Sequence, residues 1–304
     1  MNRPLPPRMS PTAPTAPTAP LPPMTPRPPA VWSGQTDDAR MEVRLRLFVV
    51  PVALVLAWIV AHTPLGGFLG RVFLSMWLHE LGHATAAWFS GRFAFPGPWR
   101  TFIGDGRSFP VVLLVSSLLL WWAVTRFRAG RRTSAAVAVA LLGVQLVCTF
   151  GLSVKSQGAL FLFAGDAGGM VLGALLVSTF FVPPEHAWRV RWLRWGFVVI
   201  GAFAFVDPLH VWWAAWGDAA EIPFGRIDGV GLSDPTRLVD EHQWREGAMI
   251  RRFLTVGAIS FTAIVVAWLR GIKLGRQELE MANDEVTAIA ARDVEEQRRH
   301  SDWR

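Results

Sequence analysis

Residues 79 to 83 read His-Glu-Leu-Gly-His and so contain the pattern His-Glu-x-x-His. In a helix, residues four positions apart share one face and lie about 6 Å apart along the axis. His79 and His83 can therefore both reach one Zn²⁺, and Glu80 lies beside them as a base for a coordinated water. Because zinc lowers the pKa of such a water toward about 7, the pattern predicts hydrolytic chemistry at neutral pH.

The surroundings of this motif strengthen the prediction. It lies within an apolar stretch, residues 67–90, and an ionisable residue inside a membrane costs a few kcal/mol on insertion scales. Three such residues within five positions are hard to explain by packing alone. The alternative is a polar patch that bonds to neighbouring helices.

A third metal ligand has two candidates, both aspartates in later apolar stretches. Asp166 is the only acid of its stretch, and the flanking glycines would allow another helix to approach closely or the helix to break. We take Asp166 as the first candidate, with a role in helix packing or substrate gating as its alternative. Asp207 is the second, because Pro208 after it could open the helix and free backbone groups.

Composition places the chain in the membrane class. Of 304 residues, 52% are hydrophobic and only 17% are charged, against about 25% charged in a soluble domain. Sixteen Trp and no Tyr suit rings anchored at a bilayer interface. The net charge of +7 could suit a nucleic-acid binder, but the basic residues form short clusters between apolar stretches. We therefore expect a lipid bilayer around the protein and no nucleic-acid partner.

Seven apolar stretches predict the elements that must position the motif. Each is near the ~20 residues that a helix needs to cross the hydrocarbon. They are residues 45–62, 67–90, 109–125, 134–153, 160–182, 195–214 and 253–269. The predicted fold is all-α, a polytopic membrane protein with about six to seven transmembrane helices.

The rest of the chain divides into three regions. Residues 1–40 are rich in proline and predict a disordered tail. Residues 41–270 form the transmembrane region, in which 215–252 is too short a loop for an independent domain. Residues 271–304 are highly charged and predict a helical tail. With two lysines against a large excess of arginine, the composition suggests a GC-rich bacterial genome, so we expect a multi-pass protein of the bacterial inner membrane.

Arginine clusters give a conflicting topology signal. If all seven stretches cross the membrane, the basic residues at 126–132, 189–194 and 270–276 fall on one side. The positive-inside rule makes that side cytoplasmic. The arginines at 40–46 would then fall outside, so one stretch is re-entrant or misplaced.

The motif helix resembles the active-site helix of the site-2 protease family of intramembrane zinc metalloproteases. The resemblance rests on His79-Glu80-Leu81-Gly82-His83-Ala84, closed by Gly91-Arg92, within an apolar stretch. It implies zinc held by two His and an Asp from a later span, with a transmembrane protein as substrate. The chain departs from the family pattern because Ala rather than Gly follows Asp166, and because two stretches rather than one separate the motifs. Asp207 would restore the family's parallel arrangement, although its local sequence fits less well.

These observations predict an intramembrane zinc endopeptidase, with Glu80 as the base that activates water. The alternative is a non-proteolytic scaffold or permease with a vestigial metal site. A purely structural zinc site has no need of a general base, and Glu80 therefore favours the enzyme. Di-iron membrane oxygenases need several histidine boxes, and a chain with seven His and one such motif does not supply them.

Overall fold

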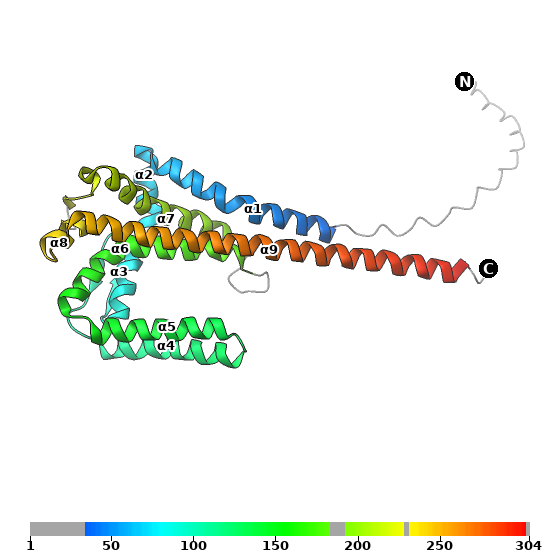
Figure 1. The fold of residues 1–304 in the computed structure, drawn as a ribbon, viewed down its shortest axis with the longest axis horizontal. Coiled ribbons are helices and arrows are strands. Elements are labelled where there is room, and N and C mark those ends of the chain that lie inside the picture. Colours follow the sequence, from blue (N-terminus) through cyan, green and yellow to red (C-terminus); the bar gives the residue numbers. More distant parts are fainter. Residues whose placement is uncertain (1–33, 183–191, 228–230, 302–304) are drawn as a thin grey trace, which may run out of the picture.

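The structure is a computed structural model that describes residues 34–182, 192–227 and 231–301. It confirms an all-α membrane protein. In these residues six helices are long and apolar enough to cross a bilayer. They are α1 (Gly34–Ala61), α4 (Phe109–Arg128), α5 (Arg132–Leu146, continued by a π-helical turn to Gly151), α6 (Val154–Ser178), α7 (Leu193–Gly217) and α9 (Glu246–Ser301). They run broadly along one direction (Figure 1).

The motif stretch is the exception among the predicted spans. Residues 67–90 fall in α2 (Pro64–Gly70), a π-helical turn (Arg71–Ser75) and α3 (Met76–Phe89). The backbone stays helical through Arg71 and Met76, so these three elements form one continuous run from Pro64 to Phe89, about 39 Å long at 1.5 Å per residue. Figure 1 shows the path from α2 to α3 running across the other helices rather than along them. The motif therefore lies on a transverse helical run, and the candidate spans among the described residues number six.

Six crossings remove the topology conflict. The start of α1, the α4–α5 turn and the C-terminal part of α9 all lie at one end of the bundle (Figure 1). Ion pairs confirm this for three helices. Arg194 of α7 lies 3.0 Å from Glu42 of α1, and Arg46 of α1 lies 3.1 Å from Glu278 of α9. The arginines at 40–46 therefore share an end with Arg194 and with the basic residues at 126–132 and 270–276.

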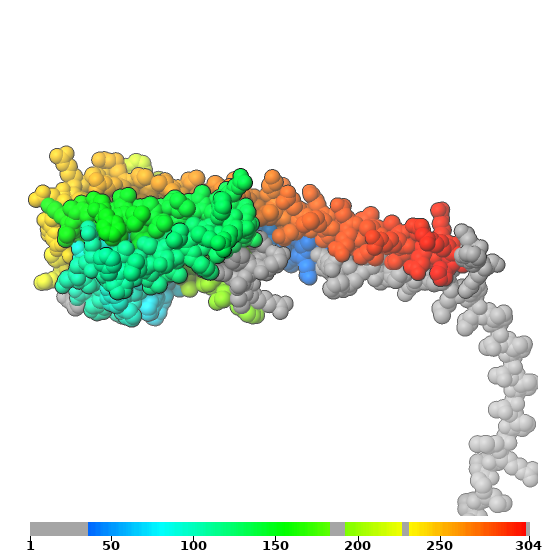
Figure 2. All heavy atoms as spheres, turned by 90° about the horizontal axis from the view of Figure 1, so that it is seen from below, coloured from blue at the N-terminus to red at the C-terminus, as the bar shows by residue number. Residues whose placement is uncertain are grey.

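Two predicted boundaries differ from the structure. Residues 34–40, expected in the Pro-rich tail, form the first turns of α1; residues 1–33 lie outside the described residues. At the other end, residues 271–301 continue α9 without a break. Figure 2 shows this part of α9 extending past the other helices.

Close packing of α3 on α6 holds the motif helix in the bundle. Gly82 of α3 faces the backbone of Ala164, Gly165 and Gly168 in α6, so closely that a Cβ on Gly82 would collide with it. The hairpin of β1 (Ala94–Pro96) and β2 (Thr101–Ile103) follows α3, in register Ala94 with Ile103. The α7–α9 connection carries the strand pair β3 (Arg226–Ile227) and β4 (Gly231–Leu232), then α8 (Asp234–Asp240).

Candidate metal site

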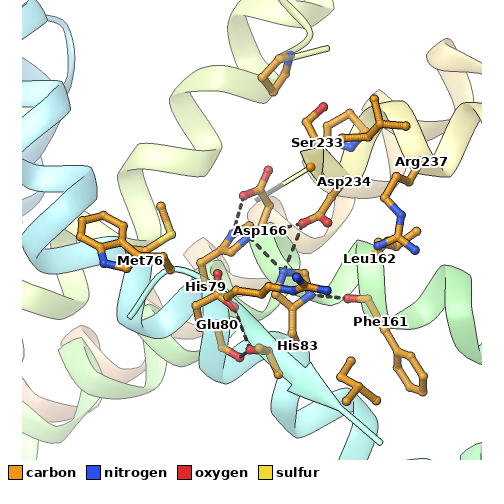
Figure 3. Close-up of a pocket in the computed structure, with 18 of the residues that line it drawn as sticks. Met76, His79, Glu80, His83, Phe161, Leu162, Asp166, Ser233, Asp234 and Arg237 are labelled. Atoms are coloured by element: carbon orange, nitrogen blue, oxygen red, sulfur yellow. Dashed lines mark hydrogen bonds and ion pairs between the residues drawn. The ribbon is translucent and has the colours of Figure 1, made fainter. Parts of the chain in front are cut away.

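The predicted motif residues come together on the face of α3 that looks toward α6. The Nε2 atoms of His79 and His83 are 3.1 Å apart, and their rings meet edge to face. Glu80 is 4% exposed. Ligand atoms of all three residues lie within 4.8 Å of one another, a grouping that could hold a metal ion. Figure 3 shows the three side chains pointing into one cavity.

The second nitrogen of each histidine ring has its own acceptor. Nδ1 of His79 lies 3.0 Å from Oδ1 of Asp166, and Nδ1 of His83 lies 2.6 Å from the backbone oxygen of Phe161. Because both partners accept, each Nδ1 donates its hydrogen to them, and Nε2 is the ring atom that each histidine can offer to a metal. Metal-binding histidines characteristically donate their other N–H to a carboxylate or a backbone carbonyl. This arrangement orients both rings for a metal.

Asp166 supports the site from behind His79. Its Oδ1 binds Nδ1 of that ring, and its Oδ2 accepts a 2.8 Å hydrogen bond from Nε1 of Trp212. Trp212 is fully buried and stacks on Phe253 with 4.0 Å between ring centroids. Both oxygens of Asp166 are therefore occupied, and they lie on the opposite side of the ring from Nε2.

Asp207, the second predicted candidate, is engaged elsewhere. Nε and Nη2 of Arg71 donate to its two oxygens at 3.1 and 3.0 Å, and the Ser75 hydroxyl donates to Oδ2 at 2.7 Å. The carboxylate is buried and its charge is neutralised by the guanidinium. Asp207 lines the same cavity as the histidines, but in the described part of the chain its carboxylate contacts Arg71 and Ser75 rather than either ring.

A third aspartate, which the sequence did not single out, faces both histidines. Oδ2 of Asp234 lies 3.1 Å from Nε2 of His83 and 3.4 Å from Nε2 of His79. Burial alone would raise the pKa of Asp234, but its contacts with the two rings lower that pKa below its usual range. Asp234 is the first residue of α8, in a polar loop where acids are ordinary. Only its neighbours Ser233 and Pro235, typical of a helix start, mark the position.

The three facing atoms fit the dimensions of a zinc site. All are acceptors, so a proton or a cation must lie among them. Zinc binds His nitrogen at about 2.0–2.1 Å and carboxylate oxygen at about 2.0–2.2 Å in a tetrahedron, which separates ligand atoms by about 3.3 Å. The observed separations are 3.1, 3.1 and 3.4 Å. His79, His83 and Asp234 therefore match the spacing of three zinc ligands.

A hydroxyl from the β-hairpin holds Glu80. Oγ1 of Thr101 lies 2.7 Å from Oε2 of Glu80 and 2.8 Å from the Glu80 backbone oxygen. The hairpin is itself tied to α3, because Nε1 of Trp88 donates to the Ala94 carbonyl at 3.1 Å. The carboxylate is thus fixed by an element that directly follows the motif helix.

The cavity in front of these groups has a volume of about 960 Å³, at the upper end of the range for ligand pockets. Its walls come from α3, the β1–β2 hairpin, α6, α7 and the α7–α9 connection. The basic residues that line it are Arg71, Arg92, Arg100, Arg226 and Arg237. A substrate entering this space would meet the two histidines and Glu80 on one wall and Asp234 on another (Figure 3).

Comparison with known protein families, curated proteins and solved structures finds no match to this chain. Its own geometry therefore carries the functional argument. The protein is a multi-span helical membrane protein in which His79, Glu80 and His83 form a cluster that could bind a metal ion.

Proposed function

We propose that the protein is a membrane-embedded zinc endopeptidase that hydrolyses peptide bonds of transmembrane protein substrates. One observation carries the proposal. Two histidine lone pairs, each oriented by a partner on Nδ1, share a cavity with a buried carboxylate, Glu80, that lies within 4.8 Å of them. The helix that carries this motif resembles the active-site helix of site-2 proteases, and this resemblance supports the peptidase class.

Glu80 has the position and the chemistry of a general acid–base. Zinc, when bound, would act as a Lewis acid toward a water molecule and the substrate carbonyl. Glu80 would take a proton from that water and pass it to the leaving amine, so the carboxylate ends the cycle as it began. Thr101 keeps the carboxylate directed at the cavity throughout.

The depth of the site agrees with a substrate inside the bilayer. Asp166 is 12 residues after Val154, the first residue of α6, and thus about 18 Å along the helix axis. An amide in an intact helix is shielded by its own hydrogen bonds. We therefore expect substrate segments to unwind in the cavity before cleavage.

The variant Glu80→Gln tests this function. The amide keeps the shape of the side chain but cannot accept the proton, so the purified variant should hold the same zinc as wild type. Cleavage should fall by at least about 100-fold, the usual contribution of general acid–base catalysis. Zinc is measured by mass spectrometry of the purified protein. Cleavage is measured by comparing new peptide N-termini in membranes that express either form.

Glu241→Gln is the matched control, because Glu241 is exposed on the α7–α9 connection and pairs with Arg237. It should behave as wild type in both measurements. Wild-type protein without zinc, or cleavage that survives Glu80→Gln, would refute the proposal. Zinc-loaded protein that produces no new N-termini would instead indicate a scaffold with a structural metal site.

A further inference from the structure

We infer that Asp234 is the third protein ligand of the metal and that Asp166 is a positioning residue behind His79. The inference rests on the proposed zinc site and specifies its ligand set. It places two ligands on the transverse helix α3 and the third on α8, in the connection between α7 and α9. No membrane-spanning helix then supplies a ligand.

Geometry separates the two aspartates. Oδ2 of Asp234 is within 3.4 Å of both Nε2 atoms, the atoms whose lone pairs face the cavity. Asp166 contacts only Nδ1 of His79, and its other oxygen is held by Trp212. To become a ligand, Asp166 would have to leave Nδ1 of His79 for the far side of the ring, whereas Asp234 makes no hydrogen bond or ion pair with any side chain among the described residues other than the two histidines.

Asp166 instead orients His79, a role that a metal site with this ligand set requires. A carboxylate that accepts from the far nitrogen of a metal-binding histidine fixes the ring and makes it a better donor toward the metal. The Phe161 carbonyl does the same for His83. Both supports come from α6, so this helix orients the two histidines while α8 completes the ligand set.

The structure holds α8 in place by contacts that do not involve Asp234. Leu238 is completely buried and Pro235 is buried, and α8 packs against α6. The N–H of Gly225 donates to Oγ1 of Thr236 at 3.0 Å, and the N–H of Ser233 donates to the Gly225 carbonyl at 2.9 Å. Asp234 is therefore presented by a fixed segment, and substitutions of its side chain should leave the fold intact.

Zinc affinity provides the first test, by competition with a chelator in the purified full-length protein. Asp234→Asn should bind zinc more than 100-fold more weakly than wild type. Asp166→Asn should lose about 10–100-fold, as expected for a residue behind a ligand. Asp234→His, which restores a ligand atom, should recover part of the lost affinity. Asp240→Asn, the same change at an exposed site on α8, should have no effect.

Absorption by bound Co²⁺ provides a second test, because it reports direct coordination and does not change when a residue only supports the fold. A thiolate bound to Co²⁺ gives a charge-transfer absorption band, so Asp234→Cys loaded with Co²⁺ should show that band. Asp166→Cys and Asp240→Cys should not, and neither should wild type, whose single Cys148 lies in the turn after α5.

The outcomes separate this inference from the proposed function. Wild-type affinity for zinc in Asp234→Asn, or the charge-transfer band in Asp166→Cys instead of Asp234→Cys, would overturn the ligand assignment while leaving a zinc enzyme. Wild-type and Asp240→Asn proteins that both fail to bind zinc would overturn the proposed function itself.

Discussion

At the scale of single residues, the four carboxylates that line the cavity differ in their hydrogen-bond and ion-pair partners. Glu80 is held by a hydroxyl, Asp166 by a histidine and an indole, and Asp207 by a guanidinium. Asp234, within the described ranges, contacts the two histidines alone, through Oδ2 and their Nε2 atoms. These contacts indicate a different role for each carboxylate, which its position in the sequence does not.

Substitution of Asp207, the second ligand candidate predicted from the sequence, tests whether these roles are distinct. Asp207→Asn should keep full zinc content, because the Asp207 carboxylate pairs with Arg71 and accepts from Ser75 rather than contacting a histidine. It should lower stability by about 1–3 kcal/mol, since the buried side chain at position 207 then has no charge to pair with Arg71 and accepts with one oxygen instead of two. Zinc analysis and thermal unfolding in detergent would measure the two effects. Zinc loss comparable to that of Asp234→Asn would contradict the structure at this point.

The sequence predicts site residues that a local pattern marks, but it does not predict Asp234, which reaches the histidines only through the fold. The spacing of His79, Glu80 and His83 dictates their shared face, so the motif alone was sufficient. Asp166 was predicted as a ligand because an acid is conspicuous in an apolar helix, and the structure places it beside Nδ1 of His79. Asp234 could not be found in this way, because an acid in a polar loop has no such contrast and its closeness to His83 depends on the path of the whole chain.

At the scale of elements, the crossing of α3 and α6 determines whether the site forms. Gly82 and Gly168 face each other there, and a Cβ on Gly165 would lie 2.5 Å from Cε1 of His79. Small residues at such crossings let two backbones approach closely. The same closeness brings Asp166 and the Phe161 carbonyl within hydrogen-bond distance of the histidine rings.

Separating these two helices should therefore disable the site without touching a polar group. Gly82→Ala would place a methyl group against the backbone of α6, and the helices would have to move apart. We expect zinc affinity to fall by at least about 10-fold, as when the support behind a ligand is lost. Gly143→Ala is the control, since a Cβ at Gly143 in α5 meets nothing within 4 Å. Unchanged zinc affinity in Gly82→Ala would show that the crossing tolerates movement.

The motif element also shows why hydropathy overcounted the spans. Residues 67–89 do lie in one helical run, because the backbone stays helical from Pro64 to Phe89 through the π-helical turn, but this run crosses the other helices instead of lying along them (Figure 1). The direction of α3 across the bundle is set by its packing on α6 rather than by its own composition. Hydropathy measures burial in apolar surroundings and carries no information on that direction.

At the scale of the whole molecule, one network fixes the relation of the first, fifth and last spans. Arg46 is fully buried, and it donates to Glu42, to Glu278 and to the backbone oxygen of Gly271. Arg194 binds Glu42 from α7. The network lies at the arginine-rich end of the bundle, whereas α8 and the cavity wall it forms lie at the opposite end (Figure 1).

This arrangement predicts the sidedness of the protein. In a Cys148→Ser background, Asp240→Cys should react with a membrane-impermeant maleimide in intact spheroplasts. Thr133→Cys, exposed at the start of α5 near the arginine-rich end, should react only after lysis, because basic clusters favour the cytoplasm. Labelling is measured by the mass shift of the protein. The reverse pattern would place α8 and its side of the cavity in the cytoplasm.

The ligand on α8 has a consequence for synthesis of the protein. Asp234 follows His83 by about 150 residues, which a ribosome adds in roughly 8–30 s at 5–20 residues per second. During that interval α3 can already have inserted beside α6, but its two histidines lack their third ligand. A chain still attached to the ribosome would therefore hold zinc weakly and would not cleave neighbouring nascent membrane proteins. Activity would begin only when the connection after α7 has emerged and folded over the cavity.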